Sequence, residues 1–219
     1  MNTFSAGSCV RFGWETFKKR PWFLIGALML AALGYTIISA VVTDILAVLI
    51  GTHGSAAALE TLVRYTISAF MGLGILSFSL KAHDEVMAVR IADLWHPHPF
   101  WRYVGAGLLT GAAFVIGLIL FIVPGIIALT MFMFAGYLVI DKGLGPIAAL
   151  KESARITKGN RLELLLLVLA VSGLTLLGLI CLIVGVFVVL PICTLASVHA
   201  YRVLSGTAHS STQDPTPAL

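Results

Sequence analysis

Phe121–Asn160 reads FIVPGIIALTMFMFAGYLVI followed by DKGLGPIAALKESARITKGN. The first half closes a run of 38 residues, Tyr103–Ile140, that contains no Asp, Glu, Lys or Arg. A single helix of that length would measure about 57 Å, nearly twice the hydrocarbon thickness of a bilayer. The run therefore has to turn, and its proline-glycine pair predicts a structural corner at Pro124–Gly125, inside a tight helical hairpin.

A second charge-free run of 38 residues, Leu164–Tyr201, is predicted to fold back between Gly178 and Gly185. Across the 219 residues, 59% are hydrophobic and only 11% are charged, whereas soluble domains carry about a quarter charged residues. Because helices satisfy their own backbone groups in lipid, we predict an all-α, polytopic membrane protein.

The apolar runs predict six transmembrane helices arranged as three hairpins, in one integral membrane domain over residues 1–205. The chain after residue 205 is polar and is predicted to be a disordered cytoplasmic tail, 206–219. An amphipathic helix over 4–19 is expected before the first span, with Val10, Trp14 and Phe17 on its apolar face. The six predicted spans are 22–42, 65–80, 103–122, 125–140, 164–181 and 185–204.

The positive charges fall on one side of this topology. Thirteen of the fourteen Lys and Arg residues lie on the side of the termini and the two polar connectors, and Arg64 is the exception. The positive-inside rule makes that side cytoplasmic. The net charge of +4 is thus explained by topology, which predicts a bacterial inner-membrane location, cytoplasmic N- and C-termini, and no nucleic-acid partner.

Three ionisable residues are expected near the outer ends of the first two spans: Asp44, Glu60 and Arg64. Glu60 and Arg64 have the spacing of a helical ion pair, and Asp44 could reach Arg64 across the hairpin. Such a cluster is a candidate proton or ion relay. Its shallow predicted depth favours a structural clamp at the outer interface.

Metal and cofactor signals are weak. The first polar connector holds imidazole and carboxylate groups, which can bind a divalent cation, but its His-Pro-His-Pro stretch predicts an extended loop. The three cysteines lack zinc or disulfide spacing. We therefore predict no metal site and no cofactor. The connector residues concerned are His83, Asp84, Glu85, Asp93, His96 and His98, and the cysteines are Cys9, Cys181 and Cys193.

Small residues in the third span are candidate helix-packing positions: Gly107, Gly111, Ala113 and Gly117. This spacing lets helix backbones approach closely. The sequence leaves open whether the partner helix belongs to the same chain or to a second copy.

The second polar connector, 145–159, predicts an amphipathic helix on the cytoplasmic side, because Gly-Pro suits its start and Gly its end. Ile147, Leu150 and Ala154 form the expected apolar stripe. The polar residues face away and form a candidate docking helix: Lys151, Glu152, Arg155 and Lys158.

The combination of GWETFKKRPW, a central VPGI and DKGLGPIAALKESARITKGN resembles the YciC-type proteins and the membrane domain fused to some glycerophosphodiester phosphodiesterases. The resemblance implies a six-helix bacterial inner-membrane protein of undefined biochemical role. The resemblance does not extend to the catalytic phosphodiesterase domain, and it assigns no role to the residues between the first two spans. The matching positions are Gly13, Trp14, Pro21, Pro124, Gly125, Gly145, Pro146, Ala149, Leu150, Ser153, Thr157, Lys158, Gly159 and Tyr201.

The sequence contains no phosphate-binding glycine loop, catalytic triad or pair of catalytic carboxylates. We therefore expect a non-enzymatic inner-membrane protein, acting as a scaffold or interaction partner of membrane components or lipid. Its expected partners are the lipid bilayer and other membrane proteins or itself. The alternative is a small transporter or channel for a lipid or amphiphilic solute, because Pro124 and Pro191 interrupt two spans.

Overall fold

The computed structural model describes residues 5–50, 54–94, 99–180 and 184–206. This part of the chain is helical, without strands, which confirms the predicted all-α class. Six helical segments are long and apolar enough to cross a membrane: Pro21–Val48, Leu59–Asp84, Phe100–Leu120, Pro124–Lys142, Arg161–Ile180 and Gly185–Leu204. The elements are α1 Ala6–Lys19, α2 Pro21–Ile50, α3 Gly54–Asp84, the 3₁₀ helix η1 Ile91–Leu94, α4 Phe100–Leu120, α5 Ile122–Phe132, α6 Ala135–Lys142, α7 Pro146–Ile156, α8 Arg161–Ile180 and α9 Val184–Leu204.

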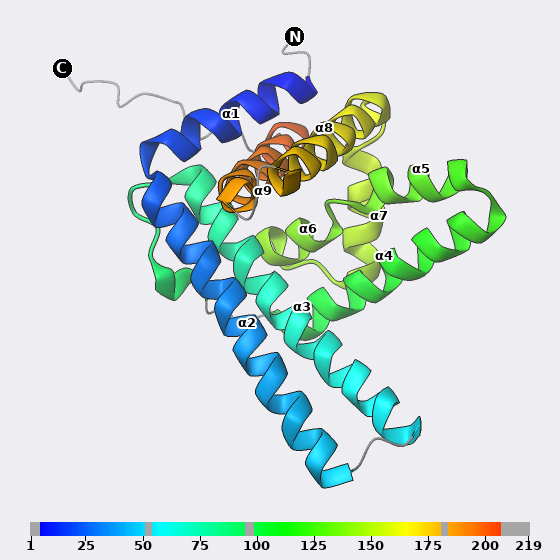
Figure 1. The fold of residues 1–219 in the computed structure, drawn as a ribbon. Coiled ribbons are helices and arrows are strands. Elements are labelled where there is room, and N and C mark those ends of the chain that lie inside the picture. Colours follow the sequence, from blue (N-terminus) through cyan, green and yellow to red (C-terminus); the bar gives the residue numbers. More distant parts are fainter. Residues whose placement is uncertain (1–4, 51–53, 95–98, 181–183, 207–219) are drawn as a thin grey trace.

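Consecutive long helices pack against each other in pairs. Figure 1 shows α2 and α3 side by side as one arm, and α4 and α5 as a second arm that extends in a different direction. The helices α8 and α9 form a third pair, and α1 lies across both of them. The short helices α6 and α7 lie between the arms, where they contact α4.

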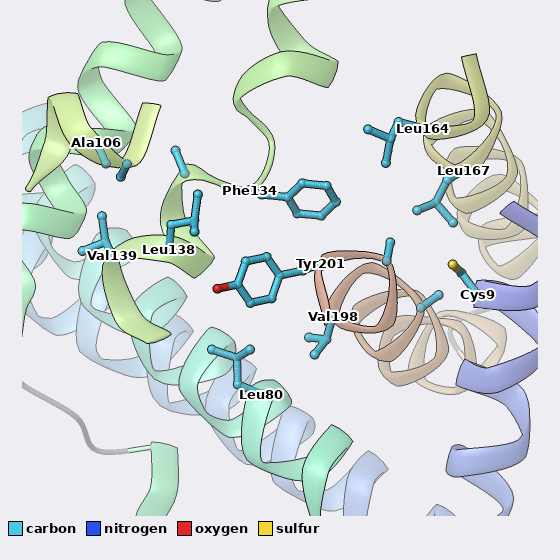
Figure 2. Close-up of a cluster of buried hydrophobic side chains, with 14 of the residues drawn as sticks. Cys9, Leu80, Ala106, Phe134, Leu138, Val139, Leu164, Leu167, Val198 and Tyr201 are labelled. Atoms are coloured by element: carbon cyan, nitrogen blue, oxygen red, sulfur yellow. The ribbon is translucent and has the colours of Figure 1, made fainter. Parts of the chain in front are cut away.

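The largest buried cluster lies where α1, α6, α8 and α9 meet (Figure 2). Tyr201 of α9 is completely buried, and its ring stacks on that of Tyr137 with centroids 5.4 Å apart. Phe134 packs near both tyrosines, while Leu164 and Leu167 of α8 close the side facing α1. Aromatic side chains of this kind bury a large apolar area each, and here they pack with aliphatic residues at the junction.

The corner of the second arm lies at Phe121, so the prediction that Pro124–Gly125 forms the turn is wrong by three residues. Phe121 is extended, with φ −172° and ψ 158°, and separates α4 from α5. Pro124 lies in the first turn of α5, where backbone N–H groups have no helical acceptor and a missing N–H costs little. Gly125 instead allows close packing, since a Cβ on Gly117 would lie 2.9 Å from its Cα.

The fourth span, predicted as one helix, is interrupted at Met133 and Phe134. Phe134 has φ −96° and ψ 3°, which ends α5 and lets α6 start in a new direction. Its side chain is fully buried in the central cluster. The break leaves the Met131 carbonyl without its usual helical donor, and the Ser153 hydroxyl of α7 donates a 2.7 Å hydrogen bond to it. A side chain from another helix thus satisfies a backbone group freed within a membrane span.

The first two spans are longer than predicted. α2 continues to Ile50 and α3 begins at Gly54, so Asp44 and Glu60 both lie within helices. Hydrophobic periodicity weakens in these outer turns, which explains the shorter predicted limits. Several predictions concern segments outside the described residues: Cys181, His96, His98, the fold-back around 181–183 and the tail beyond Gly206.

The predicted apolar face of α1 is partly wrong. Phe17 is buried as expected, but Trp14 is 45% exposed. The buried positions instead include Cys9, Gly13 and Thr16. A Cβ on Gly13 would lie 2.5 Å from the Ile192 carbonyl oxygen, so the close crossing of α1 over α9 requires a residue without a side chain.

Candidate functional site

Arg202 links the ends of three helices. Its Nη2 lies 2.6 Å from Asp84 Oδ2, at the last residue of α3, and its Nη1 lies 2.9 Å from Asp141 Oδ1, in the last turn of α6. The Tyr201 hydroxyl donates a 2.6 Å hydrogen bond to the other oxygen of Asp141. We call these four residues the polar hub. Because one guanidinium bridges two carboxylates there, α3, α6 and α9 are held together at one end.

The hub side chains are partly withdrawn from solvent. The side chains of Arg202 and Asp141 are 12% and 18% exposed, and that of Asp84 is 40% exposed. Charges that are half removed from water are costly unless each finds a partner. The geometry of the hub supplies an oppositely charged partner for each group, although Arg202 Nε is buried without a hydrogen-bond partner among the described residues.

A histidine pair, His83 and His199, adjoins the hub. His83 Nε2 lies 3.1 Å from His199 Nδ1, and His83 Nδ1 lies 3.0 Å from Asp84 Oδ1. When both rings are neutral, His83 donates to Asp84, so His199 has to donate through Nδ1. The His199 Nε2 atom is then a hydrogen-bond acceptor. The Phe12 ring of α1 stacks on His199 with centroids 4.0 Å apart.

A pocket of about 540 Å³ opens beside the histidine pair. Its polar lining comes from three segments: Thr16 and Lys19 of α1, the α3 end with Glu85, and His199 of α9. Arg20 donates hydrogen bonds to the carbonyls of Val86 and Met87, two residues that line the pocket. A volume of this size lies within the range typical of small-molecule sites.

A second pocket of about 490 Å³ adjoins the first, sharing Asp84, Glu85 and Ala88 with it, and lies against the segment that leads to η1. Lys81 and Asp93 form a 2.5 Å ion pair across it, and Asp93 also accepts a hydrogen bond from the Arg90 backbone N–H. The contacts of Asp93 with Lys81 and with the Arg90 backbone therefore tie the η1 segment to the end of α3.

The predicted outer cluster is only partly assembled. Glu60 and Arg64 form an ion pair of 3.3 Å along α3, with side chains 45% and 54% exposed. Asp44 is exposed on α2, and no hydrogen bond or ion pair joins it to Arg64 among the described residues. The contact that Asp44 could make with Arg64 across the hairpin is therefore not formed among the described residues.

The candidate docking helix α7 buries a different face from the predicted one. Ile147 is 64% exposed, whereas Ala149, Ser153 and the following Thr157 are fully buried. Small and hydroxylated side chains let α7 approach α4 and α6 closely, so packing overrides the apolar stripe. A Cβ on Gly105 of α4 would lie 2.9 Å from the Pro146 side chain.

The outer face of α7 carries Lys151 and Arg155, and Lys158 follows in the turn after the helix; all three are exposed. Glu152 is turned toward the protein and pairs with Arg155 at 2.7 Å and Lys142 at 3.6 Å. The hydrogen bonds from Arg155 are the main reason that the pKa of Glu152 is lowered from its ordinary value. The docking face is therefore strongly cationic.

The candidate packing positions on α4 behave differently from one another. Gly117 packs against Gly125 of the same arm, and Gly107 lies near the Tyr65 hydroxyl of α3. Gly111 faces open space and Ala113 is half-buried. The close backbone approach thus occurs at Gly117, within the chain.

Metal ligands do not gather in the described part of the chain: it holds no group of three or more His, Cys, Asp or Glu side chains suited to an ion. His83 and Asp84 are in contact, but Asp93 is engaged with Lys81. Cys9 is buried, and that burial raises the pKa of its thiol to about 11, which disfavours the thiolate needed for nucleophilic or metal chemistry.

The hub residues Asp141 and Arg202 were not identified from the sequence, and Tyr201 entered only as a position of the family resemblance. A usable signal was present, because Asp141 and Arg202 are the first charges after the two 38-residue charge-free runs. In a six-span topology both runs end on the same side, so these opposite charges are brought to the same end of the bundle.

Comparison with known proteins places these features in context. Residues 103–208 match a family described as "Protein of unknown function (DUF975)". The DUF975 match includes Asp141, Tyr201 and Arg202 of the hub and the whole of α7, but not α1, α2 or α3. The hub therefore joins the DUF975 segment to the helices before it.

Two uncharacterised mycobacterial proteins are similar over a longer stretch. "Uncharacterized protein Rv2560" of Mycobacterium tuberculosis and "Uncharacterized protein Mb2590" of Mycobacterium bovis are each 29% identical over 155 residues, which is 71% of this chain and 47% of each relative. The chain thus aligns with about half the length of these relatives. No solved structure matches. Since none of these names mentions YciC-type proteins, that grouping stays a prediction.

Proposed function

We propose that this chain is a non-enzymatic, multi-pass protein of the bacterial inner membrane, acting as a scaffold or interaction partner of membrane components or lipid. The observation that carries the proposal is the engagement of the hub: the groups of Asp84, Asp141 and Arg202 that could take part in chemistry bind one another instead. They hold helices together and leave the outer surfaces of the arms for interaction.

The proposed membrane arrangement has six spans in three hairpins, α2/α3, α4/α5–α6 and α8/α9, with the amphipathic helices α1 and α7 at the cytoplasmic side. Pairwise packing of these helices supports it. So do the cationic side chains of α1 and α7, which lie at the hub end, because positive residues favour the cytoplasmic face. Both termini would then be cytoplasmic.

Exposed apolar side chains support interaction with lipid or with other membrane proteins. Large aliphatic residues along α2, such as Leu33, Ile37 and Val48, are more than half exposed, as are Ile119 of α4 and Leu169 of α8. In a bilayer such faces are covered by acyl chains or by another helix. The cationic face of α7 adds a docking surface for anionic groups on the cytoplasmic side.

Extraction from native membranes tests this proposal. The tagged protein is recovered in lipid nanodiscs formed directly from the membrane, and proteins and lipids are quantified by mass spectrometry. We expect at least one protein or lipid in stoichiometric amount. A triple Lys151→Ala, Arg155→Ala, Lys158→Ala variant should lose it, whereas the matched Arg11→Ala change on α1 should not. Recovery of the protein alone would count against the proposal.

A transporter or channel for a lipid or amphiphilic solute is the second candidate. The interruption between α5 and α6 favours it, because broken spans often line transport sites. Against it, Phe134 and Ala135 at the break are buried, and Ser153 occupies the freed carbonyl. A liposome flux assay with Asp44→Asn and Arg64→Ala decides: flux that is reduced by either change supports a relay, and flux that is absent or indifferent to both excludes it.

A further inference from the structure

The pocket beside the histidine pair contains four polar groups that the rest of the described chain leaves without partners. The Thr16 side chain is almost fully buried, at 3% exposure, yet no described residue forms a hydrogen bond with its hydroxyl. Lys19 and Glu85 line the same pocket, and neither has an ion pair within the described residues. His199 uses Nδ1 to bind His83, and its Nε2 atom has no described partner.

Unpartnered polar groups that converge on one cavity are the usual signature of a ligand site. Thr16 lines the pocket, and its hydroxyl can bind an occupant with polar atoms. Of the other charged residues that line the pocket, Asp84 is already paired with Arg202 and accepts a hydrogen bond from neutral His83. Among the residues that line the pocket, the charges left for a ligand are therefore one cation, Lys19, and one carboxylate, Glu85.

This combination matches a ligand that carries both signs of charge. The Lys19 ammonium and the Thr16 hydroxyl can donate hydrogen bonds to phosphate oxygens. The Glu85 carboxylate can accept hydrogen bonds from an ammonium group, and so can the free Nε2 acceptor of neutral His199. A purely anionic phosphate would face Glu85 without compensation, and a purely cationic ligand would face Lys19.

The position of the pocket favours a lipid as the source of this ligand. It lies where two spans, Leu59–Asp84 and Gly185–Leu204, end beneath the amphipathic helix α1. Lipid headgroups occupy that level of a membrane, and α1 carries Trp14 and Lys18 on its exposed side. We propose that this pocket binds the headgroup of an aminoalkyl phospholipid, with the phosphate on Lys19 and Thr16 and the primary ammonium on Glu85 and His199.

Calorimetric titration of the purified full chain, in a detergent without phosphate, tests the assignment with three short-chain lipids. Dihexanoyl phosphoethanolamine has both groups, dihexanoyl phosphoglycerol lacks the ammonium, and dihexanoyl phosphocholine keeps the charge but has no N–H donor. We expect the phosphoethanolamine lipid to bind about tenfold more tightly than either of the others, since charge-assisted hydrogen bonds to the ammonium are lost in both.

The variants separate headgroup contacts from a structural effect. Glu85→Gln should weaken the phosphoethanolamine lipid about tenfold and leave the phosphoglycerol lipid unchanged or tighter, whereas Lys19→Gln and Thr16→Val should weaken both lipids severalfold. Matched controls on α1 outside the pocket, Arg11→Gln and Glu15→Gln, should change neither. Circular dichroism checks that each variant keeps its helices.

Equal binding of the three lipids, or an equal effect of Glu85→Gln on the first two, would overturn the proposal. Free phosphoethanolamine that binds as tightly as the lipid would overturn the lipid source and assign the site to a soluble aminoalkyl phosphate. The pocket assignment rests on the proposed lipid interaction, but different results would contradict the two proposals. If a native partner or lipid is recovered and Glu85→Gln does not change lipid binding, only the pocket assignment fails. If lipid binding is selective but the protein is recovered alone from native membranes, the proposed function fails.

Discussion

The two ends of α3 carry similar ionisable groups in different settings. Near its start, Glu60 and Arg64 pair along one helix with side chains about half exposed. At its other end, about 30 Å away along the helix, Asp84 joins Arg202 and Asp141 from two further helices, and Arg202 is only 12% exposed. Both ends carry charge, so the number of helices joined and the degree of burial distinguish the hub, which clamps three helices, from the exposed Glu60–Arg64 pair.

The largest expected effect is at Arg202. Arg202→Ala removes the shared cation and leaves two carboxylates side by side, and loss of one partner from a buried ion pair costs roughly 3 kcal/mol. Thermal unfolding followed by circular dichroism in detergent should show a clear drop in Tm. The matched Arg64→Ala change should cost only tenths of a kcal/mol, as for an exposed pair. Equal drops for both variants would remove the distinction between the two ends.

Gly13→Ala is expected to have the next largest effect. The new Cβ would lie 2.5 Å from the Ile192 carbonyl oxygen, so α1 has to shift away from α9, at a cost of about 1–3 kcal/mol. The shift should also expose Cys9, which maleimide labelling measures. The control is Gly111→Ala, where no atom lies within 4 Å, and this change should be neutral or slightly stabilising. Unchanged Cys9 labelling in Gly13→Ala would contradict the close crossing.

Ser153→Ala should have an intermediate effect, about 1 kcal/mol, because it leaves the Met131 carbonyl without a donor at the α5–α6 break. Hydrogen exchange of the amides around residues 131–135 should increase. Ser8→Ala, which removes an exposed hydroxyl bonded to the Ser5 carbonyl, serves as the control. If exchange at the break stays the same, Ser153 does not hold that turn.

The smallest expected effect concerns Glu152 and pH. Its pKa is lowered in the folded protein, chiefly by Arg155. A lowered pKa means that the stabilisation is complete above the ordinary value of 4.5 and is lost as pH falls through the folded value. The wild-type protein should therefore lose slightly more Tm than Glu152→Gln between pH 6 and about pH 3.5. Parallel Tm curves for the two proteins would show that the pair contributes nothing.

Much of the architecture could be predicted because it follows from one-dimensional constraints. Charge-free runs longer than a bilayer have to turn, and the distribution of Lys and Arg predicts an orientation. The position of the turn at Phe121 and the break at Phe134 could not be predicted, because tertiary packing decides them: Gly117 against Gly125, and Ser153 on the Met131 carbonyl.

The sites show the same limit. The outer cluster was found from the sequence because Asp44 and Arg64 stand out in apolar surroundings, yet the structure does not bring them together. The hub depends on contacts between residues 60 or more positions apart, such as Tyr201 with Asp141 and Arg202 with Asp84. The charges that end each apolar run can be read from the sequence, but their pairing depends on how the three helix pairs pack together.

A double-mutant cycle between Asp141 and Arg202 tests most directly whether the hub holds separate helices together. The variants are Asp141→Asn, Arg202→Gln and the double change, with unfolding free energies measured in mixed detergent micelles. We expect a coupling energy of about 1–3 kcal/mol, as for groups in one ion-pair network, while the equivalent cycle for Asp44 and Arg64 should be additive within about 0.5 kcal/mol. Additivity at Asp141 and Arg202 would contradict the central claim.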